Sequence, residues 1–243
     1  MSSGLLRRAV AELLGTAFLV AAVIGSGIAA VRLSPNGVGL QLLENSLITG
    51  AALVALILAL QPVSAAFNPI VTLVERALGA ITTGAAAVLI VAQVLGGVLG
   101  AIVANLMFDL SAVNLSTHQR GGGGVWLGEV VATMGLLVVI FGTVRSGRAD
   151  KVAFAVGGYI TAAYWFTSST SFANPAVTIA RMFSNTFAGI APSSVLTFIV
   201  MQLIGGLLGF GLIRLLYPAA SALAGQVAAG LEGAARLPID RSS

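Results

Sequence analysis

Six long apolar runs dominate the sequence and restrict the folds open to it. Each approaches or exceeds the ~20 residues that an α-helix needs to cross the hydrocarbon core of a bilayer. The runs lie at about 9–31, 40–62, 83–107, 125–144, 152–168 and 195–216. They are continuous, whereas a membrane β-barrel would show alternating polarity. Because only 8% of the residues are charged, the sequence predicts an all-α integral membrane protein with six transmembrane helices.

Basic residues are distributed unevenly among the predicted loops. With the N-terminus in the cytoplasm, nine Lys and Arg fall inside, and only Arg32, Arg120 and Arg181 fall outside. Such a bias predicts that both termini, including a tail at 218–243, are cytoplasmic. It also explains the net charge of +4, so the lipid bilayer and not nucleic acid is the expected partner. The short termini suggest a prokaryotic inner membrane.

The chain repeats itself within a single predicted domain, 1–243. AELLGT resembles GEVVAT, FNPIVT resembles NPAVT, and QVLGGVLG resembles QLIGGLLG, in the same order in both halves. The paired residues include Glu12 and Glu129, Asn68 and Asn174, and Gln93 and Gln202. Each half, 7–110 and 125–217, holds three spans. Because three is odd, the halves must be oppositely oriented, an inverted repeat that often places a substrate path between them.

Each half contains an Asn-Pro pair at the head of a short helical segment. Asn is a favoured N-cap and Pro suits the first helical position. The segments at about 68–78 and 174–184 are too short to cross a bilayer. We therefore expect two re-entrant half-helices that enter from opposite faces and meet near the middle. Non-helical backbone at that depth needs burial in protein or a water-filled path.

The predicted path has a definite electrostatic character. Two half-helix N-termini would direct free N–H groups and positive dipole ends at it. Asn68 and Asn174 would add amide donors, and no cluster of acids is available to hold a metal ion. The path should therefore repel cations and admit neutral polar solutes. Neither a metal nor a cofactor is expected.

With these motifs the sequence resembles the major intrinsic protein family, the aquaporins and aquaglyceroporins, over about residues 7–217. The resemblance implies an aquaporin-like fold of six spans plus two half-helices. It also implies a homotetramer with a pore in each subunit. The pore motifs it implies are Asn68, Pro69 and Ile70, and Asn174, Pro175 and Ala176.

Two acids lie within predicted spans, Glu12 and Glu129. A carboxylate at the centre of a span costs about 2.5–3.5 kcal/mol on insertion scales, so it is functional or paired. We interpret each as a buried acceptor for backbone N–H groups of the nearby re-entrant loop. A direct role in conduction is the alternative.

The resemblance also locates a selectivity filter, where this sequence departs from the family. The family usually has Arg after the second Asn-Pro-Ala, and here that position is Val177. The other filter positions fall on Thr49, or Ile48 if the preceding loop has no gap, and on Ala162 and Ser171. Arg181 follows one turn later. It either replaces part of the missing charge or extends to the surface, and the surface interpretation is preferred.

A filter of Thr49, Ala162, Ser171 and Val177 has no aromatic residue, His or Arg. Pore diameter and polarity set selectivity, so we expect a wide passive channel. Its solutes would be glycerol, small polyols, urea or neutral metalloid hydroxides such as arsenous acid, with water.

Two other functions remain as alternatives. The first is a water-selective aquaporin. The second is an ion-coupled secondary transporter, since such transporters can also have inverted repeats and broken helices. An enzyme is not expected, because the single His118 lies in the linker between the halves and no nucleophile–base pair is present.

Overall fold

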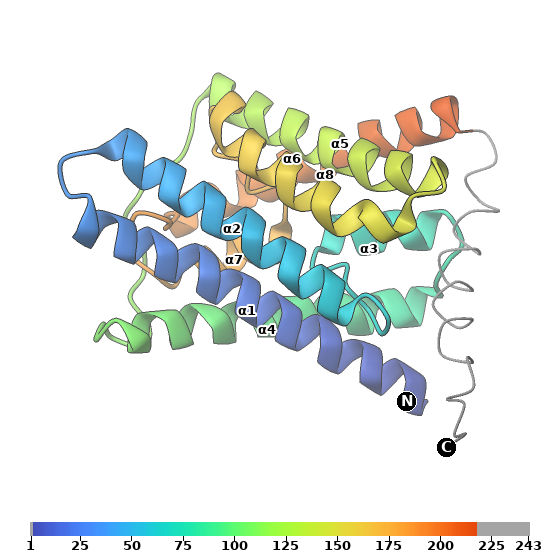
Figure 1. Ribbon diagram of the computed structural model, residues 1–243, viewed down its shortest axis with the longest axis horizontal. Helices are drawn as coiled ribbons and strands as arrows, with labels where there is room; N and C mark the ends of the chain where they lie inside the picture. Colours follow the sequence, from blue (N-terminus) through green and yellow to red (C-terminus); the bar gives the residue numbers. More distant parts are fainter. Residues whose placement is uncertain (1, 218–243) are drawn as a thin grey trace, which may run out of the picture.

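The computed structural model describes residues 2–217, which fold into helices and connecting loops. The predicted tail at 218–243 lies outside the described residues. The elements are α1 (Ser3–Leu33), α2 (Val38–Leu60), α3 (Pro69–Ala77), α4 (Thr83–Met107), α5 (Gly123–Arg145), the 3₁₀ turn η1 (Ala149–Lys151), α6 (Val152–Phe166), α7 (Pro175–Arg181) and α8 (Pro192–Leu216). The long helices run roughly along one axis of the molecule (Figure 1).

Within the described residues, five helices are long and apolar enough to span a bilayer: α1, α2, α4, α5 and α8. The fifth predicted span, 152–168, corresponds to α6, which has 15 residues and follows η1 directly. It ends at Phe166, two residues earlier than expected, because the chain turns there into the second re-entrant loop. At 1.5 Å per residue, α6 covers about 22 Å of the bilayer.

The two halves pack in the same way. α1 lies against α4, α5 lies against α8, and α2 meets α6 between the halves. Gly96 makes the first of these contacts possible, because a Cβ there would overlap the carbonyl oxygen of Leu13 in α1. Gly205 of α8 plays the same part in the second half, because a Cβ there would overlap the carbonyl oxygen of Val130 in α5. Small residues at such positions let helix backbones approach in membranes. The first glycine of each repeated pair serves this packing, whereas the second, Gly97 or Gly206, faces a half-helix.

The two half-helices begin in the middle of the bundle and run in opposite directions. α3 runs from Asn68 toward the end that holds Arg8, here called the Arg8 end. α7 runs from Asn174 toward the opposite end, which holds Arg120 and is called the Arg120 end. α7 stops at Arg181, earlier than the predicted 184. The predicted aquaporin-like fold, with two re-entrant half-helices in an inverted repeat, is confirmed.

The surface of the bundle is apolar, and many buried side chains are polar. Phe18, Leu127 and Leu196 are 62%, 62% and 72% exposed, whereas Gln93 and Gln202 are fully buried. A water-soluble domain would show the reverse, since exposed apolar area in water is unfavourable. Polar groups inside and hydrocarbon outside are what a bilayer requires. The protein is therefore an integral multi-pass membrane protein.

Candidate functional site

The first re-entrant loop is held by Glu12, which is fully buried in α1. Its Oε1 accepts hydrogen bonds from the Ser64 hydroxyl at 2.6 Å and the Ala66 N–H at 2.9 Å. Its Oε2 accepts from the Phe67 N–H at 2.7 Å and from Gln93 Nε2 at 2.8 Å. One carboxylate thus satisfies four donors. Two of them are backbone N–H groups of the loop, which have no hydrogen-bond partner within a helix or strand and need a side-chain acceptor instead.

The second loop is held in the same way by Glu129 of α5, which is also fully buried. Its oxygens accept from the N–H groups of Phe172 at 2.8 Å and Ala173 at 2.9 Å, and from Gln202 Nε2 at 2.6 Å. Gln202 also donates to the Thr178 hydroxyl at 2.8 Å. An acid, a glutamine and a threonine therefore tie each half-helix to two long helices, because Gln93 and Thr72 form the matching bond at 2.9 Å.

Both loops contain residues whose backbone has a positive φ, a conformation that residues other than glycine rarely adopt. Phe67, Thr170, Ser171 and Ala173 have φ values of +47°, +60°, +49° and +49°. Left-handed conformations of this kind are unfavourable for residues with a Cβ and persist only where the surroundings impose them. Here the carboxylates of Glu12 and Glu129 supply that restraint.

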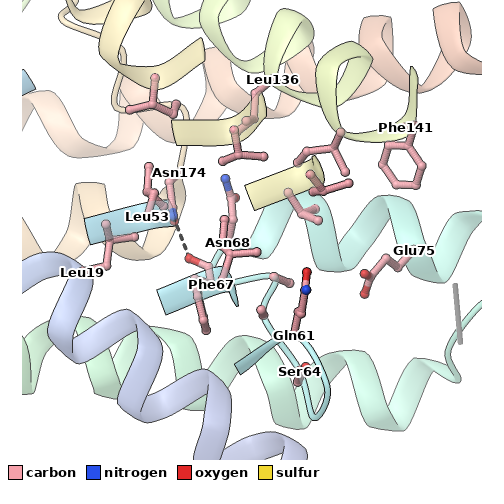
Figure 2. A pocket seen from close by; sticks show the side chains of 18 of the residues that line it. Leu19, Leu53, Gln61, Ser64, Phe67, Asn68, Glu75, Leu136, Phe141 and Asn174 are labelled. Atoms are coloured by element: carbon pink, nitrogen blue, oxygen red, sulfur yellow. Dashed lines mark hydrogen bonds between the residues drawn. The ribbon is translucent and has the colours of Figure 1, made fainter. Parts of the chain in front are cut away.

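The asparagines of the two motifs meet at the centre of the bundle, each bonded to the opposite loop. Asn174 Nδ2 donates to the Phe67 carbonyl at 2.7 Å (Figure 2), and Asn68 Nδ2 donates to the Ala173 carbonyl at 2.8 Å. Each Oδ1 caps its own half-helix. Asn68 Oδ1 accepts from the Ile70 N–H at 2.9 Å, and Asn174 Oδ1 accepts from the N–H groups of Ala176 and Val177 at 3.0 and 3.2 Å. The Asn oxygens are thus occupied, and each amide keeps one N–H.

A cavity of about 730 Å³ passes these two asparagines and extends from the Arg8 end to Arg181. Every helix of the described bundle except α4 contributes to its wall. The wall is mainly apolar, and Leu19, Leu53 and Leu136 surround the asparagines (Figure 2). Toward the Arg8 end the wall includes Gln61 and Glu75. A mostly apolar tube with a few polar groups is typical of a site for small molecules.

Three of the four residues that the sequence placed in the filter line this cavity: Thr49, Ser171 and Val177. Thr49 is 3% exposed and faces inward, whereas its alternative, Ile48, is 49% exposed on the outside. The placement of Ala162 was wrong, because Ala162 is exposed and absent from the cavity wall.

The residue of α6 that lines the cavity near Thr49 is Tyr164. Its hydroxyl lies 3.2 Å from the Thr49 hydroxyl, and its side chain is 3% exposed. Successive residues of a helix differ by about 100° around its axis, so an error of two positions selects the opposite face. The spacing of Val152, Val156, Ile160 and Tyr164, all in the wall, is the sequence signal that could have found it.

The geometry agrees with comparisons to known proteins. The family model of the major intrinsic proteins matches residues 1–171. The chain belongs to the major intrinsic protein family. Members of this family are membrane channels and not enzymes, and this protein is a channel of that kind. Within the described residues, no group of three or more His, Cys, Asp or Glu is placed to hold a metal ion.

Two curated members of the family are similar to this chain over most of their length. Aquaglyceroporin AqpS of Rhizobium meliloti (strain 1021) is 48% identical over 217 residues, which cover 88% of this chain and 92% of that protein. Aquaporin Z of Photorhabdus laumondii is 31% identical over 233 residues, covering 88% of this chain and 98% of its own. The X-ray structure of the aquaglyceroporin from Plasmodium falciparum has the same fold, with a TM-score of 0.69 at 18% identity, over 90% of this chain and 99% of that chain.

Arg181 of this family member is not at the surface, which corrects the preferred interpretation of the sequence. Its side chain is 2% exposed and lines the cavity. Its Nε donates to the Ala188 carbonyl, and its guanidinium carbon lies 3.4 Å from the centroid of the Phe172 ring. The loop after α7 folds back over the end of the helix, so the arginine cannot extend outward. The outer part of the cavity, toward the Arg120 end and here called the neck, therefore contains Tyr164 and Arg181. The aromatic residue was not expected there, whereas Arg181 was placed there by the alternative interpretation of the sequence.

The neck also contains a hydroxyl without a protein partner. Ser171 is 3% exposed and lines the cavity, and its Oγ has no hydrogen-bond partner among the described residues. A buried hydroxyl left without a partner is unfavourable by about 1–3 kcal/mol. The polar side chains that line the neck are Thr49, Tyr164, Ser171 and Arg181, and the Ser171 hydroxyl is the one of these that is buried without a partner among the described residues.

Proposed function

We propose that the protein conducts small uncharged solutes passively, with glycerol and small polyols as the main class and water passing as well. The observation that supports this most directly is the pair of asparagines at the centre of the cavity. Their acceptor oxygens cap the half-helices, so each side chain presents an N–H to the cavity. A water or alcohol oxygen can accept such a bond, whereas a cation can only be repelled.

The N-termini of α3 and α7 also disfavour cations in the cavity. The positive dipole ends of both half-helices lie at the asparagines. The remaining wall at this depth is apolar and offers no carboxylate to a cation. Glu12 and Glu129 do not compete, since backbone and amide donors occupy them; we assign them a structural role in fixing the loops.

The neck supports solutes that combine carbon and hydroxyl groups. Val177 lines the cavity one helical turn before Arg181, and Ser171 and the Thr49–Tyr164 pair line the same cavity. A polyol can place its carbon backbone on the apolar side and its hydroxyls on the polar side. The 48% identity to a protein named aquaglyceroporin favours this class. Urea and neutral metalloid hydroxides such as arsenous acid share the required lack of charge and remain candidate solutes.

Water selectivity is the second candidate function. It is favoured by Tyr164 and Arg181, which line the neck although the predicted filter contained neither an aromatic residue nor an arginine, and by the similarity to a protein named aquaporin Z. An ion-coupled transporter has less support, because the two acids that are fully buried among the long helices, Glu12 and Glu129, are engaged in hydrogen bonds to the re-entrant loops.

We further propose a homotetramer in a prokaryotic plasma membrane, with the Arg8 end in the cytoplasm. Arg8, Arg76, Arg145, Lys151 and Arg214 lie toward that end, whereas Arg32, Arg120 and Arg181 lie toward the other. An excess of basic residues marks the cytoplasmic side.

Flux into proteoliposomes tests the proposed function. We expect wild-type protein to speed glycerol entry about tenfold or more over empty liposomes, with water flux also raised. Passive conduction also requires that imposed proton or sodium gradients leave the glycerol rate unchanged. Stopped-flow light scattering measures both fluxes. Water flux without glycerol flux would establish the water-selective alternative, and a dependence on an ion gradient would establish coupled transport.

Tyr164→Ala should widen the neck. Removing the ring and its contact with Thr49 is expected to raise glycerol permeability severalfold, because pore diameter limits solutes larger than water. Ala162→Leu is the matched control on the same helix. It adds bulk outside the cavity and should leave the glycerol rate unchanged. If Ala162→Leu blocks glycerol and Tyr164→Ala has no effect, the assignment of these two residues to the neck and the outer surface is reversed. Stopped-flow light scattering on equal amounts of reconstituted protein decides this.

A further inference from the structure

A second cavity, of about 210 Å³, lies at the Arg120 end and is called here the vestibule. The polar part of its wall is formed by Asn45, His118, Arg120, Thr170 and Arg181. Arg181 lines both the vestibule and the main cavity, so the two spaces adjoin at this side chain. Any solute that passes the neck at this end of the bundle therefore meets a wall that carries two guanidinium groups.

A single short loop fixes both guanidiniums. Arg120 Nε donates to the Gly189 carbonyl at 2.8 Å, and Arg120 Nη2 donates to the Phe187 carbonyl at 3.2 Å. The carbonyl between them, that of Ala188, accepts from Arg181 Nε. Three consecutive carbonyl groups thus position two arginines that lie 61 residues apart in the sequence. Such fixed geometry lowers the entropic loss on binding a ligand.

An aromatic ring completes this arrangement. The guanidinium carbons of Arg120 and Arg181 lie 5.0 and 3.4 Å from the centroid of Phe172. The Phe172 ring attracts the positive charge of each guanidinium through its quadrupole. It has no oxygen or nitrogen atom that could accept a hydrogen bond from the guanidinium N–H groups. Most of the five N–H groups that each guanidinium carries therefore have no acceptor among the described residues.

The wall of the vestibule carries no negative charge to balance the arginines. The charge of Glu129 acts on Arg120, but Glu129 lies outside this wall and is bonded to the second re-entrant loop. None of the residues in its wall is acidic. Among the described residues the one ion pair joins Lys151 and Asp150, at the opposite end of the bundle. Burial lowers the pKa of Arg120 to about 10, so this group stays protonated at neutral pH. Burial and then the charges of Arg120 and Arg181 lower the pKa of His118, which is the response expected of a histidine in a positive field.

We propose that the vestibule is a binding site for small monovalent oxyanions, held between Arg120 and Arg181. Planar oxyanions such as nitrate or a short carboxylate match the fork of a guanidinium and accept paired hydrogen bonds from it. The volume of about 210 Å³ admits an anion of this size. The anion would supply both the counter-charge and the acceptors that the protein does not. This site lies beyond the proposed function, because conduction of neutral solutes does not require it.

Thermal unfolding of the detergent-solubilised protein tests the site, with sodium nitrate replacing sodium chloride at constant ionic strength. A ligand that binds only the folded state raises its stability in a saturable way. We expect the wild-type unfolding midpoint to rise by about 2–5 °C as nitrate saturates the site. Chloride is a single atom and cannot offer two separate acceptors to the two parallel N–H groups of a guanidinium fork, as two oxygens of nitrate can. The exchange therefore isolates the proposed recognition from general screening.

Variants locate the effect. Arg120→Gln should abolish the nitrate response, and Arg120→Lys, which keeps the charge but loses the fork, should reduce it by more than half. Arg32→Gln is the matched control. Arg32 also lies at the Arg120 end, donates to a backbone carbonyl at 2.7 Å and contacts a phenylalanine ring, but it is not in the vestibule wall. This variant should respond like wild type.

The outcome is decisive without any transport measurement. No nitrate response in wild type, or equal responses in wild type and Arg120→Lys, would overturn the site. A response lost in Arg32→Gln would also overturn it. If Arg120→Gln does not fold, Arg120→Lys and Arg32→Gln still decide the question. Since unfolding is measured and not flux, failure of this proposal is separate from failure of the proposed channel function.

Discussion

Glu12→Ala is expected to lower the unfolding midpoint of the purified protein by on the order of 10 °C, or to prevent its accumulation. The substitution leaves three donors without an acceptor, the Ser64 hydroxyl and the N–H groups of Ala66 and Phe67. Gln93 Nε2 loses one of its two acceptors and keeps the Thr72 hydroxyl. Each buried donor left without an acceptor costs about 1–3 kcal/mol. In a chain of this size each kcal/mol corresponds to roughly 2–4 °C. Thermal unfolding in detergent, followed by circular dichroism, measures the shift.

Glu44→Ala is the control for this experiment. Glu44 is also part of a membrane helix, but it accepts a single bond, from the Ser34 hydroxyl at 2.7 Å, near the turn between α1 and α2. Its loss should cost about 0.5–1.5 kcal/mol. If both variants shifted the midpoint equally little, the loop would not depend on Glu12. Intact stability of Glu12→Ala together with lost flux would instead indicate the direct role in conduction that the sequence left open.

Val177→Arg is expected to reduce glycerol permeability by about tenfold or more, while water permeability falls less. Val177 is 5% exposed and lines the neck, one helical turn before Arg181. An arginine there would fill the neck and add a second fixed positive charge beside the first. Glycerol needs a wider passage than water does. In the variant it also no longer meets the apolar surface that Val177 provides. Stopped-flow light scattering on proteoliposomes with equal protein content measures both permeabilities.

Val177→Leu separates the effect of bulk from that of charge. Leucine adds one methylene without charge, so we expect a reduction in glycerol flux of about twofold only. Equal reductions in both variants would mean that volume alone controls the neck. Glycerol flux unaffected by Val177→Arg would mean that the neck lies elsewhere along the cavity.

Local sequence was sufficient to predict the architecture. The apolar runs predicted the long helices because a bilayer admits little else of that length and polarity. Asn68-Pro69 and Asn174-Pro175 predicted the starts of α3 and α7, because N-capping and proline at the first position are properties of the chain at that point. The odd number of spans in each half then required the inversion.

The error at Ala162 shows where local prediction fails. Tyr164 lines the cavity and Ala162 does not, and the two differ by only two positions. The direction of a side chain on α6 depends on how that helix is rotated against α2, which is settled by contacts across the bundle. One such contact is the close approach of Gly157 and Gly50, whose backbones would collide with any added Cβ. Such contacts between distant segments have no signature within either segment.

The sequence by itself determined the membrane class, the inverted repeat and the two half-helices, because hydrophobicity, capping and span length act over a few neighbouring residues. Only the tertiary structure decided which side chains face the neck and where Arg181 points. The loop carbonyls at 187–189 bind Arg120 from the linker and Arg181 from α7. That arrangement exists only when three segments distant in the sequence come together. The character of the neck is therefore a property of the folded bundle, and no local pattern specifies it.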